Sequence, residues 1–174
     1  MGNERLPAVV VGRQDVDLPA VRIDNVTPEA DAVRHLVSLG HSNIAYLGGP
    51  RNSYTMDDRL LGYMQGLEAH SLPHDASLVS HGELTLEDGF RRATRLLDLG
   101  TGRPTAIVAC NDQLAIGAIS AAHEHDIRIP TDLAVVGFHN IPVAADVWPW
   151  VTTMDITRYK IGVAALELLL SVIS

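Results

Sequence analysis

The sequence lacks the features that would place the protein in a membrane or outside the cell. No stretch of its 174 residues approaches the ~20 consecutive apolar residues that span a bilayer. Residues 1–12 also lack the basic start and long apolar run of a signal peptide. Cys110 is the single cysteine, which excludes an internal disulfide and fits a reducing compartment. We therefore expect a cytoplasmic protein that has no contact with a membrane.

Positive charge is scarce as well. The chain has 13 Lys and Arg against 21 Asp and Glu, for a net charge of -8, and its basic residues form no dense stripe. A chain of this charge repels the phosphate backbone of nucleic acids. We expect any DNA contact to come from a segment outside this chain.

The motifs of the common cofactor sites and hydrolases are also missing. Gly48 and Gly49 follow an apolar run, but no dinucleotide fingerprint or phosphate loop surrounds them. The sequence contains no Gly-x-Ser-x-Gly motif, and its eight histidines come without a His-Glu-x-x-His motif or paired cysteines. We expect no metal site, no cofactor and no enzymatic activity.

Two short apolar runs indicate strands that are buried on both faces. Residues 106–109 and 133–136 flank a segment, 112–126, whose apolar residues recur at helical spacing. An Asn or Asp stands in capping position before this helix. Strand, helix and strand in this order form one unit of a parallel sheet, and 47% apolar residues suffice for a packed core.

The same alternation extends along most of the chain. Thr27 is expected to cap a helix that has Pro28 at its first position and Gly40 after its last turn. Two Thr/Asp pairs with the spacing of a capping box predict helices after Thr55 and Thr85. Strands are expected at residues 8–11, 20–23, 43–47 and 78–80, an irregular segment after 139, and a final helix at 157–173. The sequence therefore predicts an α/β fold with a parallel sheet flanked by helices.

Polar residues follow the two buried strands at the point where each ends. Asn111 comes directly after the first strand, and His139 comes shortly after the second. In open α/β sheets, ligands bind beyond the carboxyl ends of the strands. These residues therefore predict a binding cleft, although Asn111 also fits the role of a helix cap.

Several short motifs occur in one order along the chain, from "IDN" at 23–25 and "HLVSLGHSNIAYLGGP" at 35–50 to "DRLLGY" at 58–63. The series continues with "CNDQLAIGA" at 110–118, "IPTDLAVVGF" at 129–138 and "VTTMDI" at 151–156. It resembles the effector-binding core of the lac-repressor (LacI/GalR) family of transcription regulators, over residues 9–173. The resemblance implies a type I periplasmic-binding-protein-like fold, with two α/β subdomains and a cleft between them.

By this resemblance the chain is N-terminally truncated, since family members begin with a helix-turn-helix, a hinge helix and further strands. Residues 1–23 would be the tail of the N-terminal effector-binding subdomain, residues 24–154 a complete C-terminal subdomain, and residues 155–174 a return helix that packs on the N-terminal subdomain. Operator DNA would be bound only through the helix-turn-helix that this chain lacks.

The resemblance also implies a set of ligand-binding residues. Arg59 matches the arginine that grips effector hydroxyls or carboxylates, a task that suits its planar fork of donors. Asn111 matches the family's ligand-binding asparagine. Leu84 stands where many members have an aromatic residue that stacks on the ligand. Thr55, at the start of the helix that carries Arg59, is also expected to bind the ligand. A helix-surface ion pair is the alternative interpretation of Arg59.

Three further positions depart from the family pattern. His139 and Gly12 each stand where an aspartate often accepts hydrogen bonds from ligand hydroxyls, and Ile156 replaces a frequent polar residue. We still include His139 and Gly12 in the ligand-binding set. The pocket is expected to be less acidic than a typical sugar site.

The function that follows is effector sensing and dimerisation in a DNA-binding regulator. The effector would be a sugar, a sugar derivative or another small polar metabolite. Val147 and Trp148, in an apolar loop, are expected at the interface of a homodimer, although the tryptophans could instead cover their own core. The alternatives are a solute-binding protein of a sugar ABC transporter, which shares the fold, and a Rossmann-like enzyme, for which the required glycine loop is missing.

Overall fold

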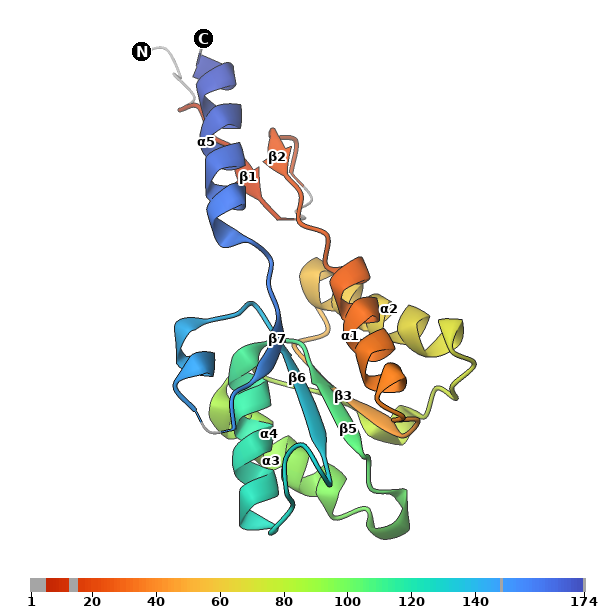
Figure 1. The fold of residues 1–174 in the computed structure, drawn as a ribbon. Helices are drawn as coiled ribbons and strands as arrows, with labels where there is room; N and C mark the ends of the chain where they lie inside the picture. The colour runs from red at the N-terminus through yellow and green to blue at the C-terminus, as the bar shows by residue number, and fades with distance from the viewer. Residues whose placement is uncertain (1–5, 13–15, 148, 174) are drawn as a thin grey trace. The chain divides into compact units, whose positions relative to one another are not determined.

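The computed structural model describes residues 6–12, 16–147 and 149–173, and it divides into two compact units. The larger unit comprises Asn25–Asp155. The smaller unit contains the segments up to Asp24 and from Ile156 onward (Figure 1). Each unit has its own sheet. The assignment of these units to N-terminal and C-terminal effector-binding subdomains stays a prediction.

The larger unit is built on a five-stranded parallel sheet with the order β4-β3-β5-β6-β7. Every residue of the three central strands is buried, which explains why these strands appear in the sequence as continuous apolar runs. The predicted α/β fold with a parallel sheet is confirmed. The strands are β3 (Ile44–Gly48), β4 (Val79–His81), β5 (Ala106–Ala109), β6 (Ala134–Phe138) and β7 (Thr152–Met154).

Four helices cover the two faces of this sheet. Figure 1 shows α1 (Val26–Ser38) and α2 (Tyr54–Ala69) together on one face, and α3 (Leu86–Leu97) and α4 (Asp112–Glu124) on the other. The residues that α1 and α3 bury are mostly apolar and recur every three or four positions, as the sequence pattern predicts. None of the helices in the described ranges is long and apolar enough to cross a membrane.

Two of the predicted helix caps are confirmed. The Thr85 hydroxyl accepts a hydrogen bond from the Asp88 amide at 3.2 Å, and Asn111 Oδ1 accepts one from the Leu114 amide at 2.8 Å. Both contacts satisfy backbone donors in the first turn of a helix, which have no partner within the helix.

The other two predicted caps are wrong. The first helix has Asn25 rather than Thr27 in the cap position, so Pro28 lies within its first turn, where a missing N–H costs no helical hydrogen bond. The second helix starts one residue before Thr55, because Ser53 has the extended conformation of a cap and its carbonyl accepts from Met56.

The edge strand β7 was also absent from the predicted strands. It is only three residues long, and none of these is fully buried.

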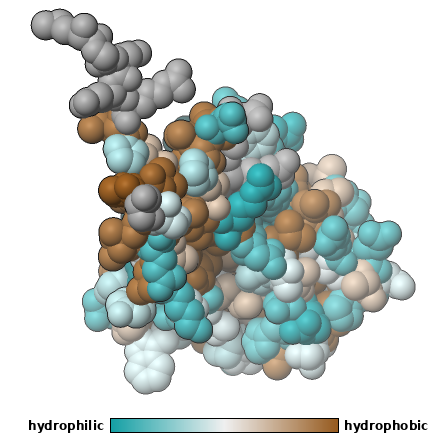
Figure 2. Space-filling model, turned by 90° about the horizontal axis from the view of Figure 1, so that it is seen from above, coloured by the Kyte–Doolittle hydropathy of each residue, from teal (hydrophilic) through white to brown (hydrophobic). Residues whose placement is uncertain are grey.

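The smaller unit contains a parallel pair of short strands and one long helix. The strands β1 (Val10–Val11) and β2 (Ala20–Val21) are shorter than predicted. The helix α5 (Arg158–Ile173) packs against both strands, yet it has no fully buried residue. Several of its apolar side chains are exposed, and apolar surface is visible as brown atoms in Figure 2.

The helices α3 and α4 approach each other closely because glycine lies at their contact. A Cβ atom added to Gly89 would come within 2.7 Å of the Leu114 backbone. A Cβ atom added to Gly117 would overlap the Leu86 carbonyl oxygen and the Phe90 nitrogen. This spacing leaves no room for a methyl group.

Replacing Gly117 by alanine should therefore destabilise the larger unit, although alanine is the better helix former. We expect the free energy of unfolding, measured with a chemical denaturant, to fall by about 1–3 kcal/mol. Gly102→Ala is the control, because its added Cβ would come no closer than 3.9 Å to Leu99. The control should change the free energy by less than about 0.5 kcal/mol. Equal stabilities of the two variants would contradict the close packing.

Candidate functional site

The candidate site lies at the carboxyl ends of the central strands in the larger unit. The structure brings together Arg59 from α2, His139 after β6, and Cys110, which immediately follows β5 and precedes Asn111. Arg59 Nη2 lies 2.7 Å from His139 Nε2, and Nη1 donates to the Cys110 carbonyl. Residues that are far apart in the sequence thus form one connected polar group.

Arg59 is the centre of this group and is only 2% exposed. Its Nε and Nη2 atoms each donate to Asn25 Oδ1 at 3.1 Å. The guanidinium lies over the ring of Phe138, 3.9 Å from the ring centroid, which is a favourable position for a cation on an aromatic face. Burial lowers its pKa from the usual value. The alternative of a surface ion pair is wrong, since the side chain is buried and none of these partners is a carboxylate.

His139 has a positive φ of 105°, which side chains other than glycine seldom adopt. Its amide donates to the Met154 carbonyl at 2.9 Å, and the Asn140 amide donates to the Thr153 hydroxyl at 3.1 Å. Since a guanidinium can only donate, His139 Nε2 must be the acceptor in the contact with Arg59. The imidazole is therefore neutral, with its proton on Nδ1.

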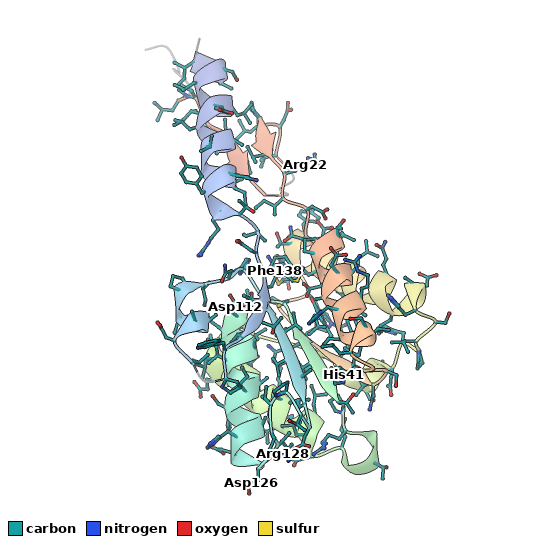
Figure 3. The ribbon with its side chains drawn as sticks, in the orientation of Figure 1. Arg22, His41, Asp112, Asp126, Arg128 and Phe138 are labelled. Atoms are coloured by element: carbon teal, nitrogen blue, oxygen red, sulfur yellow. The ribbon has the colours of Figure 1, made fainter. Side chains whose placement is uncertain are left out.

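Asp112 fixes the segment that contains His139, a role that the sequence analysis missed. Its Oδ2 accepts from the Ile141 amide at 2.8 Å, and its Oδ1 accepts from the Thr153 hydroxyl. The side chain is fully buried at the first position of α4, at the same end of the sheet as Phe138 (Figure 3). The signal in the sequence was an aspartate shortly after the apolar run at residues 106–109.

Asn111 uses both ends of its side-chain amide within the chain. In addition to the cap described above, Nδ2 donates to the Leu84 carbonyl at 3.1 Å. One N–H of this amide remains for another acceptor. The contact places the backbone of the half-buried Leu84 beside Asn111.

The remaining predicted residues are less closely connected. Thr55 is half-buried in the first turn of α2, four residues before Arg59 and so on the same side of the helix. Gly12 belongs to the smaller unit, where it follows β1 with a φ of 99°. Ile156 also belongs to that unit. The ligand-binding roles of all six residues stay predictions.

A buried acid, Glu29, lies on α1 near Arg59 and was not anticipated. It is 1% exposed, and among the described residues neither of its oxygens has a hydrogen-bond partner. Burial raises its pKa to about 8, and the positive charge of Arg59 opposes this shift only in part. Tyr46 contributes a second buried oxygen without a partner in the described ranges. Burial, followed by the negative charge of Glu29, raises the pKa of this phenol.

Arg92 is a second buried arginine, and it holds the ends of two strands. Nη1 donates to the carbonyls of Gly48 and Ser80, both at 2.8 Å, and Nη2 donates to that of Glu83 at 2.9 Å. Its charge is balanced by Asp88, whose carboxylate lies 2.7 Å away. The Asp/Arg spacing of four within one helix was the sequence signal for this pair.

Cys110 has the surroundings of an unreactive core thiol. It is fully buried, and burial raises its pKa to about 12, so the thiolate is not populated at neutral pH. Within the part of the chain that the structure describes, no three His, Cys, Asp or Glu side chains gather where they could hold a metal ion.

The loop predicted to form a dimer interface lies elsewhere on the larger unit. Val147 is half-buried and lines an open groove beside α4, together with Ile116, Ile119, His123, Ile127 and Pro149. Trp148 lies outside the described residues. Trp150 is 71% exposed.

The carboxyl edge of a parallel sheet is the place where α/β domains commonly bind ligands. The family of periplasmic-binding-protein-like domains matches residues 33–174. The repressor CytR of Escherichia coli K12 is 36% identical over 171 residues, which are 97% of this chain and 50% of that protein. The chain thus spans about half the length of this curated relative.

Solved structures give the same result. A regulatory protein of the LacI family from Chloroflexus aggregans superposes with a TM-score of 0.91 at 37% identity, covering 95% of this chain and 60% of that one. A sugar-binding LacI-family regulator from Escherichia coli, solved with phosphate, superposes with a TM-score of 0.88 at 30% identity over the same shares. The chain belongs to the family of periplasmic-binding-protein-like domains, and the relatives described above are repressors or regulators that it matches over half to three fifths of their length.

The buried acid Glu29 makes the stability of the larger unit depend on pH. In the unfolded chain Glu29 ionises near 4.5, but in the folded chain it ionises only near 8. Between these values only the unfolded chain loses the proton, so the free energy of unfolding falls as the pH rises, by up to about 1.4 kcal/mol per pH unit. Glu29→Gln should remove this slope and exceed the wild type in stability by a margin that grows from pH 5 to pH 8.

Chemical denaturation at several pH values would measure the effect. Glu68→Gln is the matched control, because it makes the same change at an exposed position of α2. If Glu29→Gln and the wild type show parallel pH profiles, the assignment of Glu29 as a protonated buried acid is wrong.

Proposed function

We propose that the chain is the effector-sensing module of a LacI-type transcription regulator, and that Arg59, Asn111 and His139 bind the effector. The observation that supports this most directly is that Arg59 contacts His139 and the Cys110 carbonyl, just before Asn111, at the carboxyl edge of a parallel sheet, where α/β proteins bind ligands. Leu84 and Thr55 flank the group on the larger unit. The effector is a sugar, a sugar derivative or another small polar metabolite, as the sugar-binding relative suggests.

In this proposal the two units are the two effector-binding subdomains, with residues 24–154 as the C-terminal one. Gly12, in the smaller unit, is a proposed ligand-binding residue of the other subdomain. An effector that prefers one arrangement of the subdomains shifts the population towards it. This shift changes the geometry of DNA-binding segments outside this chain and thereby the affinity for the operator.

The relatives favour a regulator over a solute-binding protein of a transporter, because those that match are transcription repressors and regulators. We also propose that the protein is not an enzyme. Asp112 uses both oxygens in structural hydrogen bonds, and Cys110 is a buried thiol. Neither group is available as a base or a nucleophile.

The first test uses the full-length protein. A mobility-shift screen would identify a metabolite that changes the affinity for operator DNA, and calorimetry would measure its binding. Arg59→Ala and Asn111→Ala should each weaken effector binding by at least about tenfold, or about 1.4 kcal/mol. Arg95→Ala, at an exposed position of α3, is the control and should have no effect. The site assignment fails if both site variants stay within about twofold of the wild type.

We further propose that the chain forms a homodimer through the loop that contains Val147 and Trp148. The groove beside Val147 is lined by apolar residues and by the charged Glu124, Asp126 and Arg128, and the Trp150 side chain is exposed. Protein interfaces combine an apolar centre with a polar rim. Trp148→Asp should convert a dimer into a monomer in sedimentation experiments at on the order of 10 µM. Leu99→Asp, an exposed apolar position on another loop, should leave the dimer intact. A wild-type monomer, or an unchanged dimer of Trp148→Asp, would refute the interface.

A further inference from the structure

The charge of Arg59 has no ionised partner among the described residues. Its hydrogen bonds go to the Asn25 amide oxygen, the Cys110 carbonyl and the neutral imidazole of His139. Arg92 provides the comparison within the same unit, because it is equally buried but has the carboxylate of Asp88 at 2.7 Å. A buried charge is stable in a protein when an opposite charge compensates it. Among the described residues, Arg59 has no carboxylate within hydrogen-bonding distance.

The two nearby acids attract the guanidinium only through space. Asp112 is fully buried and uses its oxygens for the Ile141 amide and the Thr153 hydroxyl. Glu29 makes no hydrogen bond to the guanidinium, and its burial favours the neutral acid. The hydrogen bonds that Arg59 makes therefore all go to neutral groups.

The acceptors that a neutral sugar would need already accept hydrogen bonds within the chain. Sugar hydroxyls bind best where a carboxylate or amide oxygen can accept their protons. Asn111 Oδ1 accepts from Leu114, and each Asp112 oxygen accepts one bond, so only their second lone pairs remain. Two donors have no partner in the described part of the chain, namely one N–H of Asn111 Nδ2 and one N–H of Arg59 Nη1.

We propose that the effector is an anion, a carboxylate- or phosphate-bearing metabolite, and that His139 occupies its place on Arg59 when no effector is bound. The inference rests on the proposed function of this site. Arg59 is 2% exposed, whereas His139 is only half-buried, so a ligand reaches the guanidinium by displacing the imidazole from Nη2. An anionic oxygen is the stronger acceptor for a guanidinium, which favours the exchange.

One pair of substitutions at position 139 isolates the charge. Aspartate and asparagine have the same shape and both tolerate positive φ better than most residues. His139→Asp would place a carboxylate beside Arg59, and His139→Asn would place a neutral amide there. Without any ligand, His139→Asp should therefore have a higher unfolding temperature than His139→Asn. A temperature equal to or below that of His139→Asn overturns the inference, because Arg59 would then not lack a counter-charge.

Calorimetry on the full-length protein tests the ligand class. The probes are glucose 6-phosphate, gluconate and inorganic phosphate, with glucose as the neutral counterpart. We expect at least one sugar-derived anion to bind the wild type at least about tenfold more tightly than glucose. His139→Asp should lose at least about tenfold more of this affinity than His139→Asn. Gln113→Glu, an exposed position of α4, adds the same charge without contact to Arg59 and should lose less than His139→Asp.

The outcomes separate this inference from the function on which it rests. Binding of glucose with an affinity equal to or above that of the anions overturns the inference, and the effector-sensing function stands. Binding of no anion overturns the inference as well, whatever the screen for an operator-releasing metabolite finds. If the anions bind but Arg59→Ala leaves their affinity unchanged, both the inference and the assigned site are wrong.

Discussion

The larger unit depends on a charged guanidinium that is buried where its helices meet the end of the sheet. Arg59 extends from α2 and donates to the Asn25 side chain just before α1. It also donates to the Cys110 carbonyl just after β5 and lies over the ring of Phe138, the last residue of β6. One side chain thus links two helices to the ends of β5 and β6. Arg92 does the same for β3 and β4 on the other face of the sheet. The strand ends are held in place by arginines rather than by apolar packing alone.

This arrangement also explains how much of the fold could be predicted. The apolar run at residues 106–109 matches β5 to the residue, because burial on both faces leaves a continuous signal. The helix caps at Thr85 and Asn111 were equally readable, since a cap acts within three residues. Thr55 has the same local spacing but lies inside its helix. Local spacing alone does not show which of several polar residues occupies the cap position of a helix.

The position of the candidate site could be predicted, but its contacts could not. Strand-end position and family resemblance both pointed to Asn111 and His139. The structure places His139 against Arg59, and Asn111 directly after the Cys110 carbonyl that Arg59 contacts. Asp112 and Glu29 were missed, because a polar residue in an apolar stretch does not reveal which distant donor or cation it will face. Such contacts form only when elements far apart in the sequence pack together. The sequence therefore indicated where a ligand could bind. Which charged groups face one another at that point follows only from the three-dimensional structure.

The positive φ of His139 has a consequence for how such a site changes during evolution. Few side chains tolerate this backbone conformation, and the short polar ones, asparagine and aspartate, are among them. Codons for both differ from those for histidine at the first base only. A single nucleotide exchange can therefore move position 139 between neutral and negatively charged without disturbing the turn that Asp112 holds. Paralogues that diverge at this one position could acquire different ligands while they keep the same framework.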